Sequence, residues 1–350
     1  MGGKLWKNTF KPRCCGIWSA LSKEQLNFAD IINEFIDNAR AAAATRITVH
    51  LVQTDTDEFS LEVTDDGYGM AREDFDQIFS VGALRGALAY KRCGMGLKVA
   101  LANADPENLS WEIRTKTTNG ECSYIGAPYA EQMAFESLNP KELKSLRRSG
   151  TIISSMLSRS VFERGLEGTE SDEERIAMLV EILRVTYAPL LPKEQQEEGD
   201  SHLSIQLLWT PLLGQKQIID LTALSPIWAQ QNVGYDRANI VKHDSEVYAQ
   251  YTFGKINLMP ENWRFYRGDR KSAGLMVYLH GRLVQYGIFS EIWNCENPRQ
   301  NDFLFVVNLD GVVTKLPLCN GGKTQLKIED TTVHDFLRWV QQTCPEPLKG

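Results

Sequence analysis

The stretch Ser60–Met70, SLEVTDDGYGM, constrains this chain more than any other. Apolar and polar residues alternate over Leu61–Thr64, which predicts a half-buried strand, and Asp65, Gly67 and Gly69 follow directly after it. Asp-Gly pairs are common in hairpin turns, so a simple turn is one interpretation. The other is a ligand pocket, in which the carboxylate accepts a hydrogen bond and the glycines let the backbone approach the ligand closely.

Length and composition narrow the class of protein. The chain has 350 residues, enough for two domains or one large one, and 43% hydrophobic and 24% charged residues are ordinary for a globular protein. A net charge of -7 argues against a main surface that grips nucleic acid, although a local basic patch remains possible. No apolar run approaches the length of a membrane span, and no secretory signal is visible. The seven cysteines have no zinc spacing, which favours reduced thiols inside a cell.

Periodicity predicts a mixed chain with strands and helices in both halves. Residues 22–44 have helical spacing, and residues 46–52 and 59–65 read as two strands joined by a turn. Composition changes near residues 158–202, where a helix over Glu173–Tyr187 precedes an acidic loop. The predicted class is α+β, and the predicted regions are 1–165, a connecting helix and acidic loop over 166–200, and 201–350.

Glu34 and Asn38 are the first candidate site residues. They lie four apart on the first predicted helix, so they share one helix face. Mg²⁺ prefers oxygen ligands and often takes only one or two from a protein, and Asn38 offers such an oxygen. Glu34 can hold a water and accept its proton. The alternative is an amphipathic helix with an ordinary polar face.

A second set of candidates lies downstream in CGMGLKVA. Gly94 and Gly96 precede a predicted helix that carries Lys98. Backbone N–H groups at a helix N-terminus can bind phosphate, and the helix dipole adds to the attraction. A tight turn is the alternative. Further on, SGTII places the hydroxyl of Thr151 at the start of a predicted strand, which means little by itself.

The order of these four motifs carries more information than any one of them. Glu-x-x-Asp-Asn on a helix, strand-Asp-x-Gly-x-Gly, Gly-x-Gly-Leu-Lys and Gly-Thr follow one another over roughly residues 20–155. This series resembles the GHKL ATPases, named for gyrase, heat-shock chaperones, histidine kinases and MutL. The resemblance implies a GHKL (Bergerat) α/β sandwich that binds Mg-ATP.

The resemblance also implies a role for each motif residue. Asp65 would accept a hydrogen bond from the adenine amino group, helped through a water by Thr151, and Asp66 would be a structural neighbour. Asn38 would be the Mg²⁺ ligand and Glu34 the general base, with residues 80–95 as the ATP lid. The remaining contacts would be Gly67, Gly69 and Met70 around the base, and Gly94, Met95, Gly96, Leu97 and Lys98 around the phosphates.

Two departures from the family pattern bear on turnover. Many relatives carry an acid at the position of Ala41, and the lid usually has a further glycine where this chain has Lys91 and Arg92. A stiffer, more basic lid implies a chain that binds ATP well and hydrolyses it slowly.

The second half narrows the resemblance to the MORC family of chromatin-associated GHKL ATPases. FIDNA, SVGA, GMGLKVA and SGTII look like MORC sequences, as do residues 273–287 and 306–330. A transducer (ribosomal-S5-like) α/β domain is therefore expected after the first. In such domains one lysine reaches the terminal phosphate of ATP; Lys323 is the candidate here and Lys327 the second. The alternative for Lys323 is a solvated turn lysine.

The resemblance implies an ATP-hydrolysing enzyme whose nucleotide state controls dimerisation of two copies around DNA or chromatin. It implies nuclear localisation if the source is eukaryotic, and otherwise a cytoplasmic one. Two alternatives remain open: an ATP-binding interaction module with little or no turnover, and a DNA-processing ATPase like MutL or topoisomerase VI. The segment RFYRGDRK, residues 264–271, is basic and aromatic and can contact nucleic acid, whereas His280 and Trp293 are expected to be packing residues.

Overall fold

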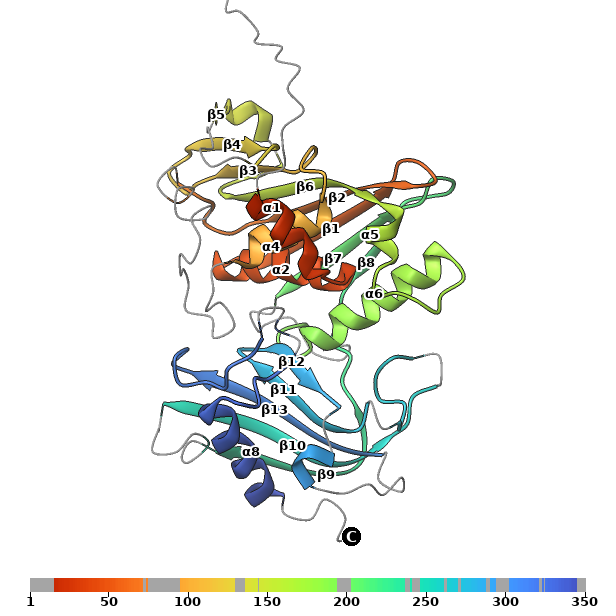
Figure 1. Cartoon of the computed structure of the whole chain (residues 1–350), viewed down its shortest axis with the longest axis vertical. Helices are drawn as coiled ribbons and strands as arrows, with labels where there is room; N and C mark the ends of the chain where they lie inside the picture. Colours follow the sequence, from red (N-terminus) through yellow and green to blue (C-terminus); the bar gives the residue numbers. More distant parts are fainter. Residues whose placement is uncertain are drawn as a thin grey trace, which may run out of the picture.

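The computed structural model contains two sheets, each with its own helices and its own hydrophobic core (Figure 1). The residues that the structure describes are 16–71, 74, 95–129, 136–143, 145–193, 203–236, 240, 246–260, 263–269, 272–287, 290–293, 302–320, 323 and 325–344. Within these residues, no helix is both long and apolar enough to cross a membrane.

The first sheet has eight strands in the order β5-β4-β3-β6-β2-β1-β7-β8. Neighbouring strands are antiparallel, except that β1 and β7 are parallel. The strands are β1 (Arg46–Gln53), β2 (Glu58–Asp65), β3 (Glu112–Lys116), β4 (Cys122–Gly126), β5 (Glu136–Ser137), β6 (Gly150–Ser158), β7 (Ser204–Thr210) and β8 (Gln217–Asp220).

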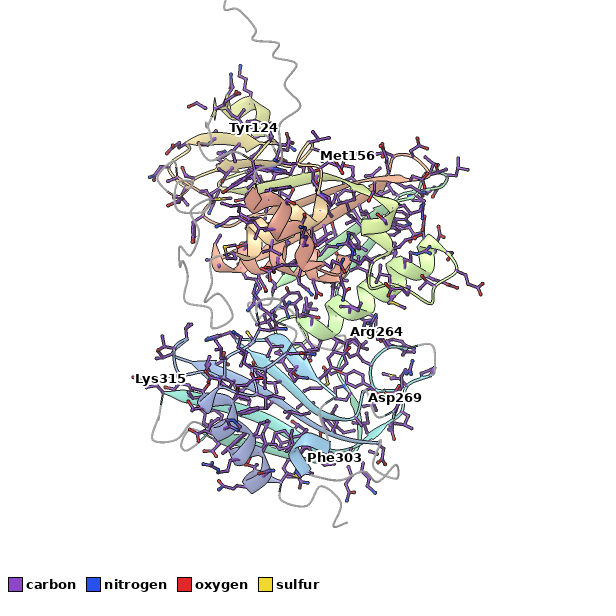
Figure 2. The ribbon with its side chains drawn as sticks, viewed as in Figure 1. Tyr124, Met156, Arg264, Asp269, Phe303 and Lys315 are labelled. Atoms are coloured by element: carbon purple, nitrogen blue, oxygen red, sulfur yellow. The ribbon has the colours of Figure 1, made fainter. Side chains whose placement is uncertain are left out.

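Helices cover one face of this sheet. Figure 1 shows α1 (Gly16–Leu21), α2 (Phe28–Ala41) and α4 (Gly96–Ala104) packed together against the strands. Alternate strand residues face these helices and are buried, and on the opposite face lie Tyr124 and the partly exposed Met156 (Figure 2). The remaining elements of this part are η1 (Ser22–Glu24), η2 (Pro140–Leu143), α5 (Arg159–Glu163) and α6 (Asp172–Thr186).

The local sequence explains where α6 begins. Ser171 accepts a hydrogen bond from the Glu174 N–H, and Glu174 in turn accepts one from the Glu170 N–H. Together these contacts satisfy donors that the first helical turn leaves unpaired. Helix α6 then contacts α2 on one side and β12 on the other, so it joins the two sheets.

The second sheet has five strands in the order β12-β11-β13-β10-β9. Helix α8 packs on one face of this sheet, where Trp339 meets Phe305 and Tyr251 edge to face. The elements are β9 (Ile227–Asp236), β10 (Val247–Asn257), β11 (Gly274–Leu279), β12 (Arg282–Tyr286), α7 (Ser290–Trp293), β13 (Phe303–Gly311) and α8 (Thr331–Thr343).

The structure agrees with most of the predicted elements and differs at the predicted boundary. Strands β7 and β8, up to Asp220, belong to the first sheet because β7 pairs with β1 in parallel register. The division between the sheets therefore comes after residue 220, later than the expected start of the second region at 201. The acidic segment that suggested this boundary connects α6 to β7 within one sheet system.

Two secondary interpretations have a structural outcome. In the basic and aromatic segment, Phe265 and Tyr266 are buried, so neither ring is open for stacking on a nucleic-acid base. Arg264 lies beside α6 (Figure 2), where it donates to the Gly165 carbonyl. Trp293 donates to the Cys344 carbonyl at 2.7 Å, which is the packing role expected for it.

Candidate functional site

The strand-end carboxylate of Asp65 lies in a buried polar cluster on three neighbouring strands. Asp65 pairs with Thr151 across β2 and β6, and Thr151 pairs with Thr115 across β6 and β3. All three side chains are buried, and the Asp65 Oδ1 accepts the Gly67 N–H at 2.8 Å. The sheet register therefore brings together two predicted residues, Asp65 and Thr151, and one that the sequence did not suggest, Thr115.

Thr115 orders the chain that follows the aspartates. Its hydroxyl donates to the Gly150 carbonyl at 3.0 Å and accepts the Met70 N–H at 2.9 Å. It also lies 3.4 Å from the Thr151 hydroxyl. Thr115 belongs to no motif of its own, and only the pairing of β3 with β6 shows that it lies here.

Burial controls the charge of Asp65. Loss of solvent raises the pKa of this carboxyl to about 6, and hydrogen bonds from the Gly67 and Thr151 N–H groups offset only part of that effect. Among the described residues no cation compensates this carboxylate, which has acceptor capacity for a further donor group. A strongly shifted carboxyl in a pocket is a typical feature of a functional site.

The two glycines after Asp65 are required by close backbone contacts. Gly69 has φ +74°, and a Cβ there would lie 2.2 Å from the Lys116 carbonyl oxygen. A Cβ on Gly67 would lie 2.7 Å from the Ala42 carbonyl oxygen. The chain therefore passes between α2 and β3 through a space that admits no side chain.

Asp66 has the structural role that was expected for it. Its carboxylate accepts N–H groups of Thr45 and Arg46 and the Arg46 guanidinium, at 2.8 to 3.0 Å. Burial alone would raise the pKa of Asp66, but these hydrogen bonds lower it below its ordinary value. The two adjacent aspartates therefore differ in environment, and of the two only Asp65 lies in the buried cluster with Thr115 and Thr151.

Helix α2 presents Glu34 and Asn38 beside the start of α4. The Asn38 amide donates to the Glu34 carbonyl at 2.7 Å, which leaves its oxygen as the acceptor end of the amide. A Cβ on Gly96 would lie 1.9 Å from the Glu34 carboxylate, so the backbone of α4 touches this side chain. Glu34 is only 4% exposed, which rules out the interpretation of an ordinary solvated polar face.

The start of α4 has the form of an anion site. Met95 precedes the helix without a side-chain cap, and Gly96 begins it. Met95, Gly96 and Leu97 are partly buried, whereas Lys98 is fully buried and burial lowers its pKa to about 8. Gly94 and the lid residues 80–94, including Lys91 and Arg92, lie outside the described residues.

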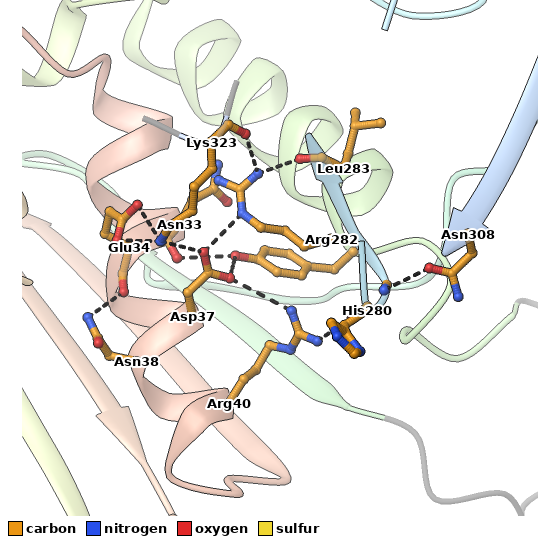
Figure 3. Close-up of polar contacts among 12 residues, drawn as sticks. Asn33, Glu34, Asp37, Asn38, Arg40, His280, Arg282, Leu283, Asn308 and Lys323 are labelled. Carbon is orange, nitrogen blue, oxygen red and sulfur yellow. Dashed lines mark hydrogen bonds and ion pairs between the residues drawn. The ribbon is translucent and has the colours of Figure 1, made fainter. Parts of the chain in front are cut away.

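Lys323 reaches this site from the second sheet system (Figure 3). Its ammonium lies 2.6 Å from the Glu34 carboxylate and 3.2 Å from Asp37 Oδ2, although 289 positions separate Lys323 from Glu34. Lys323 is only 4% exposed and has φ +54°, a left-handed conformation that is uncommon for residues other than glycine. It is therefore not a solvated turn lysine. Lys327 makes a backbone contact with Leu318 instead.

The Asp37 carboxylate accepts hydrogen bonds from residues of both sheet systems. Arg282 donates to Oδ2 at 3.0 Å, and the Tyr187 hydroxyl donates to Oδ1 at 3.2 Å. Arg40 lies 3.7 Å from Oδ1 and donates to the His280 carbonyl at 2.6 Å. His280 and Gly281 have positive φ values and form the turn between β11 and β12 that positions Arg282.

Sequence patterns point only weakly to these residues. Asp37 is the Asp of the Glu-x-x-Asp-Asn motif, and Arg282 lies within residues 273–287, which resemble MORC sequences. Burial alone would lower the pKa of Arg282, but Asp37, Tyr187, Glu34 and Asp30 raise it further above its ordinary value. Burying such charges is costly unless they are paired, so this network makes the docking of the two sheet systems specific.

The described residues contain no cluster of three or more metal-ligating side chains. A Mg²⁺ ion that is bound mainly by phosphates and waters needs no such cluster, and one or two protein oxygens are enough. Asn38 is half-buried at the edge of the site and meets that requirement.

Comparisons with known proteins agree with this geometry. Residues 26–124, which contain α2, β1, β2, α4 and β3, match the family described as Histidine kinase-, DNA gyrase B-, and HSP90-like ATPase. No curated protein sequence matches the chain. Among solved structures, the N-terminal domain of a DNA repair protein is similar, with a TM-score of 0.51 and 11% identity over 93% of this chain and 97% of that one.

The match of residues 26–124 to a GHKL-type ATPase model and the two sheet systems confirm the predicted fold class, an α+β chain in which a GHKL-like α/β sandwich precedes a second α/β domain. At this identity the structural likeness shows the fold alone. It extends over both sheet systems, so the arrangement of the two is shared with the solved domain.

We predict that Asp65→Asn stabilises the chain in the absence of nucleotide. The folded pKa of about 6 lies above the unfolded value of 3.8, so the ionised carboxylate costs stability above about pH 6 and this cost fades as the pH falls. Asparagine keeps the acceptor for Gly67 without the charge. The free energy of unfolding in urea should rise by up to about 3 kcal/mol at about pH 7.5, and by about half of that at about pH 5. A loss of stability at the higher pH would contradict the assignment.

Proposed function

We propose that this chain is a Mg²⁺-dependent ATPase in which the second domain completes the active site of the first. One observation carries the proposal. The Lys323 ammonium of the second domain lies 2.6 Å from the Glu34 carboxylate of α2, beside Gly96 at the start of α4. A base, a helix N-terminus and a buried cation thus meet at one point, which is the set of groups that phosphoryl transfer requires.

The Asp65 pocket would bind the adenine base. The carboxylate would accept a hydrogen bond from the exocyclic amino group, with Thr151 nearby to hold a water. Gly67, Gly69 and Met70 would line the ring, because the glycines keep this backbone free of side chains. Thr115 would fix the Met70 N–H and so the shape of this wall.

The terminal phosphate would lie between the start of α4 and α2. The backbone N–H groups near Gly94, Met95, Gly96 and Leu97 would hold the phosphate oxygens, with Lys98 close by. Asn38 would supply a Mg²⁺ ligand, and the ion would offset phosphate charge. Glu34 would take a proton from the attacking water as its oxygen bonds to phosphorus and the bond to ADP breaks.

Lys323 would change partners during this cycle. In the structure its ammonium contacts Glu34 and Asp37, and these two contacts join the second domain to α2. A triphosphate carries more negative charge than one carboxylate, so it would draw Lys323 away and free Glu34 to act as a base. Because the lysine belongs to the second domain, its movement would report the nucleotide state to that domain.

We propose by resemblance that ATP binding then joins two copies of the chain into a clamp, as in the MORC family, with DNA or chromatin as the partner and the nucleus as the location in a eukaryote. We also propose that the unit ending near residue 220 is the ATP-binding domain.

A second candidate function is that of a DNA-processing ATPase like MutL or topoisomerase VI. The similarity to the N-terminal domain of a DNA repair protein over 93% of the chain supports this alternative.

A third candidate is a nucleotide-binding module with little turnover, which the pairing of Glu34 with Lys323 favours. Hydrolysis of ATP by the purified protein separates this candidate from the first two.

Glu34→Ala should retain binding of ATP and lose hydrolysis by more than about a hundredfold, because a general base contributes about that much. Phosphate release and binding of a fluorescent ATP analogue measure the two properties.

Glu62→Ala is the matched control for this test. Glu62 lies on the same sheet system but on its open face, where it pairs with Arg114 at 3.1 Å. We expect this variant to hydrolyse ATP at the wild-type rate. Equal rates for Glu34→Ala and wild type would remove Glu34 from its proposed role.

Nucleotide should also change the oligomeric state. With Mg²⁺ and a non-hydrolysable ATP analogue, we expect the mass from light scattering to rise from that of the 39.6 kDa chain to twice that value. Asp65→Ala, which would lose the adenine contact, should stay monomeric under the same conditions. A mass that does not change while the analogue is bound would contradict the clamp.

A further inference from the structure

Two cations of the second domain share one carboxylate of the first. The Asp37 Oδ2 atom accepts from the Arg282 guanidinium at 3.0 Å and from the Lys323 ammonium at 3.2 Å. Lys323 also contacts Glu34, whereas Arg282 makes no hydrogen bond to Glu34 among the residues that the structure describes. The two cations are therefore not equivalent, since one contacts both carboxylates and the other contacts only Asp37.

Arg282 is the more firmly held of the two. It is 2% exposed, it begins β12 directly after the turn at His280, and it donates to the backbone carbonyls of Leu283 and Lys323. Its guanidinium is rigid and planar, whereas a lysine ammonium sits on a flexible four-carbon stem. The strand thus fixes Arg282, whereas Lys323 belongs to none of the helices and strands that the structure describes.

Arg282 also has an unused donor. Within the described part of the chain, its Nη2 atom is buried without a hydrogen-bond partner. In a guanidinium, Nε–H and Nη2–H point in the same direction and can hold both oxygens of one carboxylate. Nε already contacts Asp37, so a small shift would let Arg282 hold Asp37 by both atoms once the Lys323 ammonium has left Oδ2.

We propose that Arg282 is a positioning residue that keeps Asp37 neutralised and so allows Lys323 to leave Glu34 for the nucleotide. This inference rests on the proposed ATPase function. With Arg282 present, only Glu34 loses its cation when Lys323 moves, and Glu34 is the group that must become a base. Loss of the partner of a buried carboxylate strongly destabilises the fold. Arg282 prevents that outcome at Asp37 because it stays bound to this carboxylate.

Removal of Arg282 should therefore trap Lys323. Among the residues that the structure describes, Asp37 would retain the Tyr187 hydroxyl and the more distant Arg40, at 3.7 Å, and Lys323 would be the nearest cation left beside it. Its departure would then leave Asp37 undercompensated. We expect Arg282→Met to lower kcat for ATP about tenfold with a smaller change in KM, because a coupling of that size is usual for contacting charges.

The decisive variant is the double substitution Asp37→Asn/Arg282→Met. Asparagine does not need a cation, so Lys323 should be free again and kcat should recover to within about threefold of the Asp37→Asn single variant. A role limited to packing would give no such rescue. Arg338→Met, on the exposed face of α8, is the matched control and should leave kcat and KM unchanged.

Arg282→Lys keeps the positive charge and lacks the two-donor fork, and it covers the case in which Arg282→Met does not fold. Its kcat should lie between those of wild type and Arg282→Met; a wild-type kcat would contradict the need for the fork. If the wild type hydrolyses ATP but the double variant shows no rescue, the proposed role of Arg282 is overturned. If the wild type neither binds nor hydrolyses ATP, the proposed function on which this inference rests is overturned instead.

Discussion

The buried charges of helix α2 determine how the two halves of this molecule fit together. Glu34 and Asp37 lie one turn apart on this helix, and neither carboxylate is open to solvent. Lys323 of the second domain contacts both of them, and Arg282 of the same domain contacts Asp37. Since unpaired buried charges are costly, docking of the second domain is specified by these contacts and not only by apolar packing. The same helix is thus part of the first core and of the interface.

The motifs of the first half could be recognised in the sequence because the residues of each motif are close together in the chain. Asp65, Gly67 and Gly69 lie within a few residues of one another, and their spacing follows from a strand that ends in a tight loop. The partners that complete the pocket are not local. Thr115 reaches Asp65 only through the pairing of β3, β6 and β2, a register that no short segment encodes. Arg282 lies 245 positions from Asp37, so sequence gave no reason to join them.

The same distinction explains the outcome for the fold. Helices and alternating strands were predictable from their periodicity, and the mixed class followed from them. Strand β9 has no such periodicity, because most of its residues are exposed, so its sequence does not predict a strand. The division between the sheets was placed too early because β7 joins β1 in parallel, a pairing across a long connection. An acidic loop indicates a connection between elements, but it does not show on which side of it a sheet ends.

A crystal structure with Mg²⁺ and a non-hydrolysable ATP analogue is the most direct test of the account that the second domain senses nucleotide through Lys323. We expect the base at Asp65, the terminal phosphate at the start of α4, and the Lys323 ammonium on that phosphate, no longer within 2.6 Å of Glu34. The contact between Arg282 and Asp37 should remain. A bound analogue with Lys323 still paired to Glu34, or an analogue bound away from Asp65 and α4, would contradict this account.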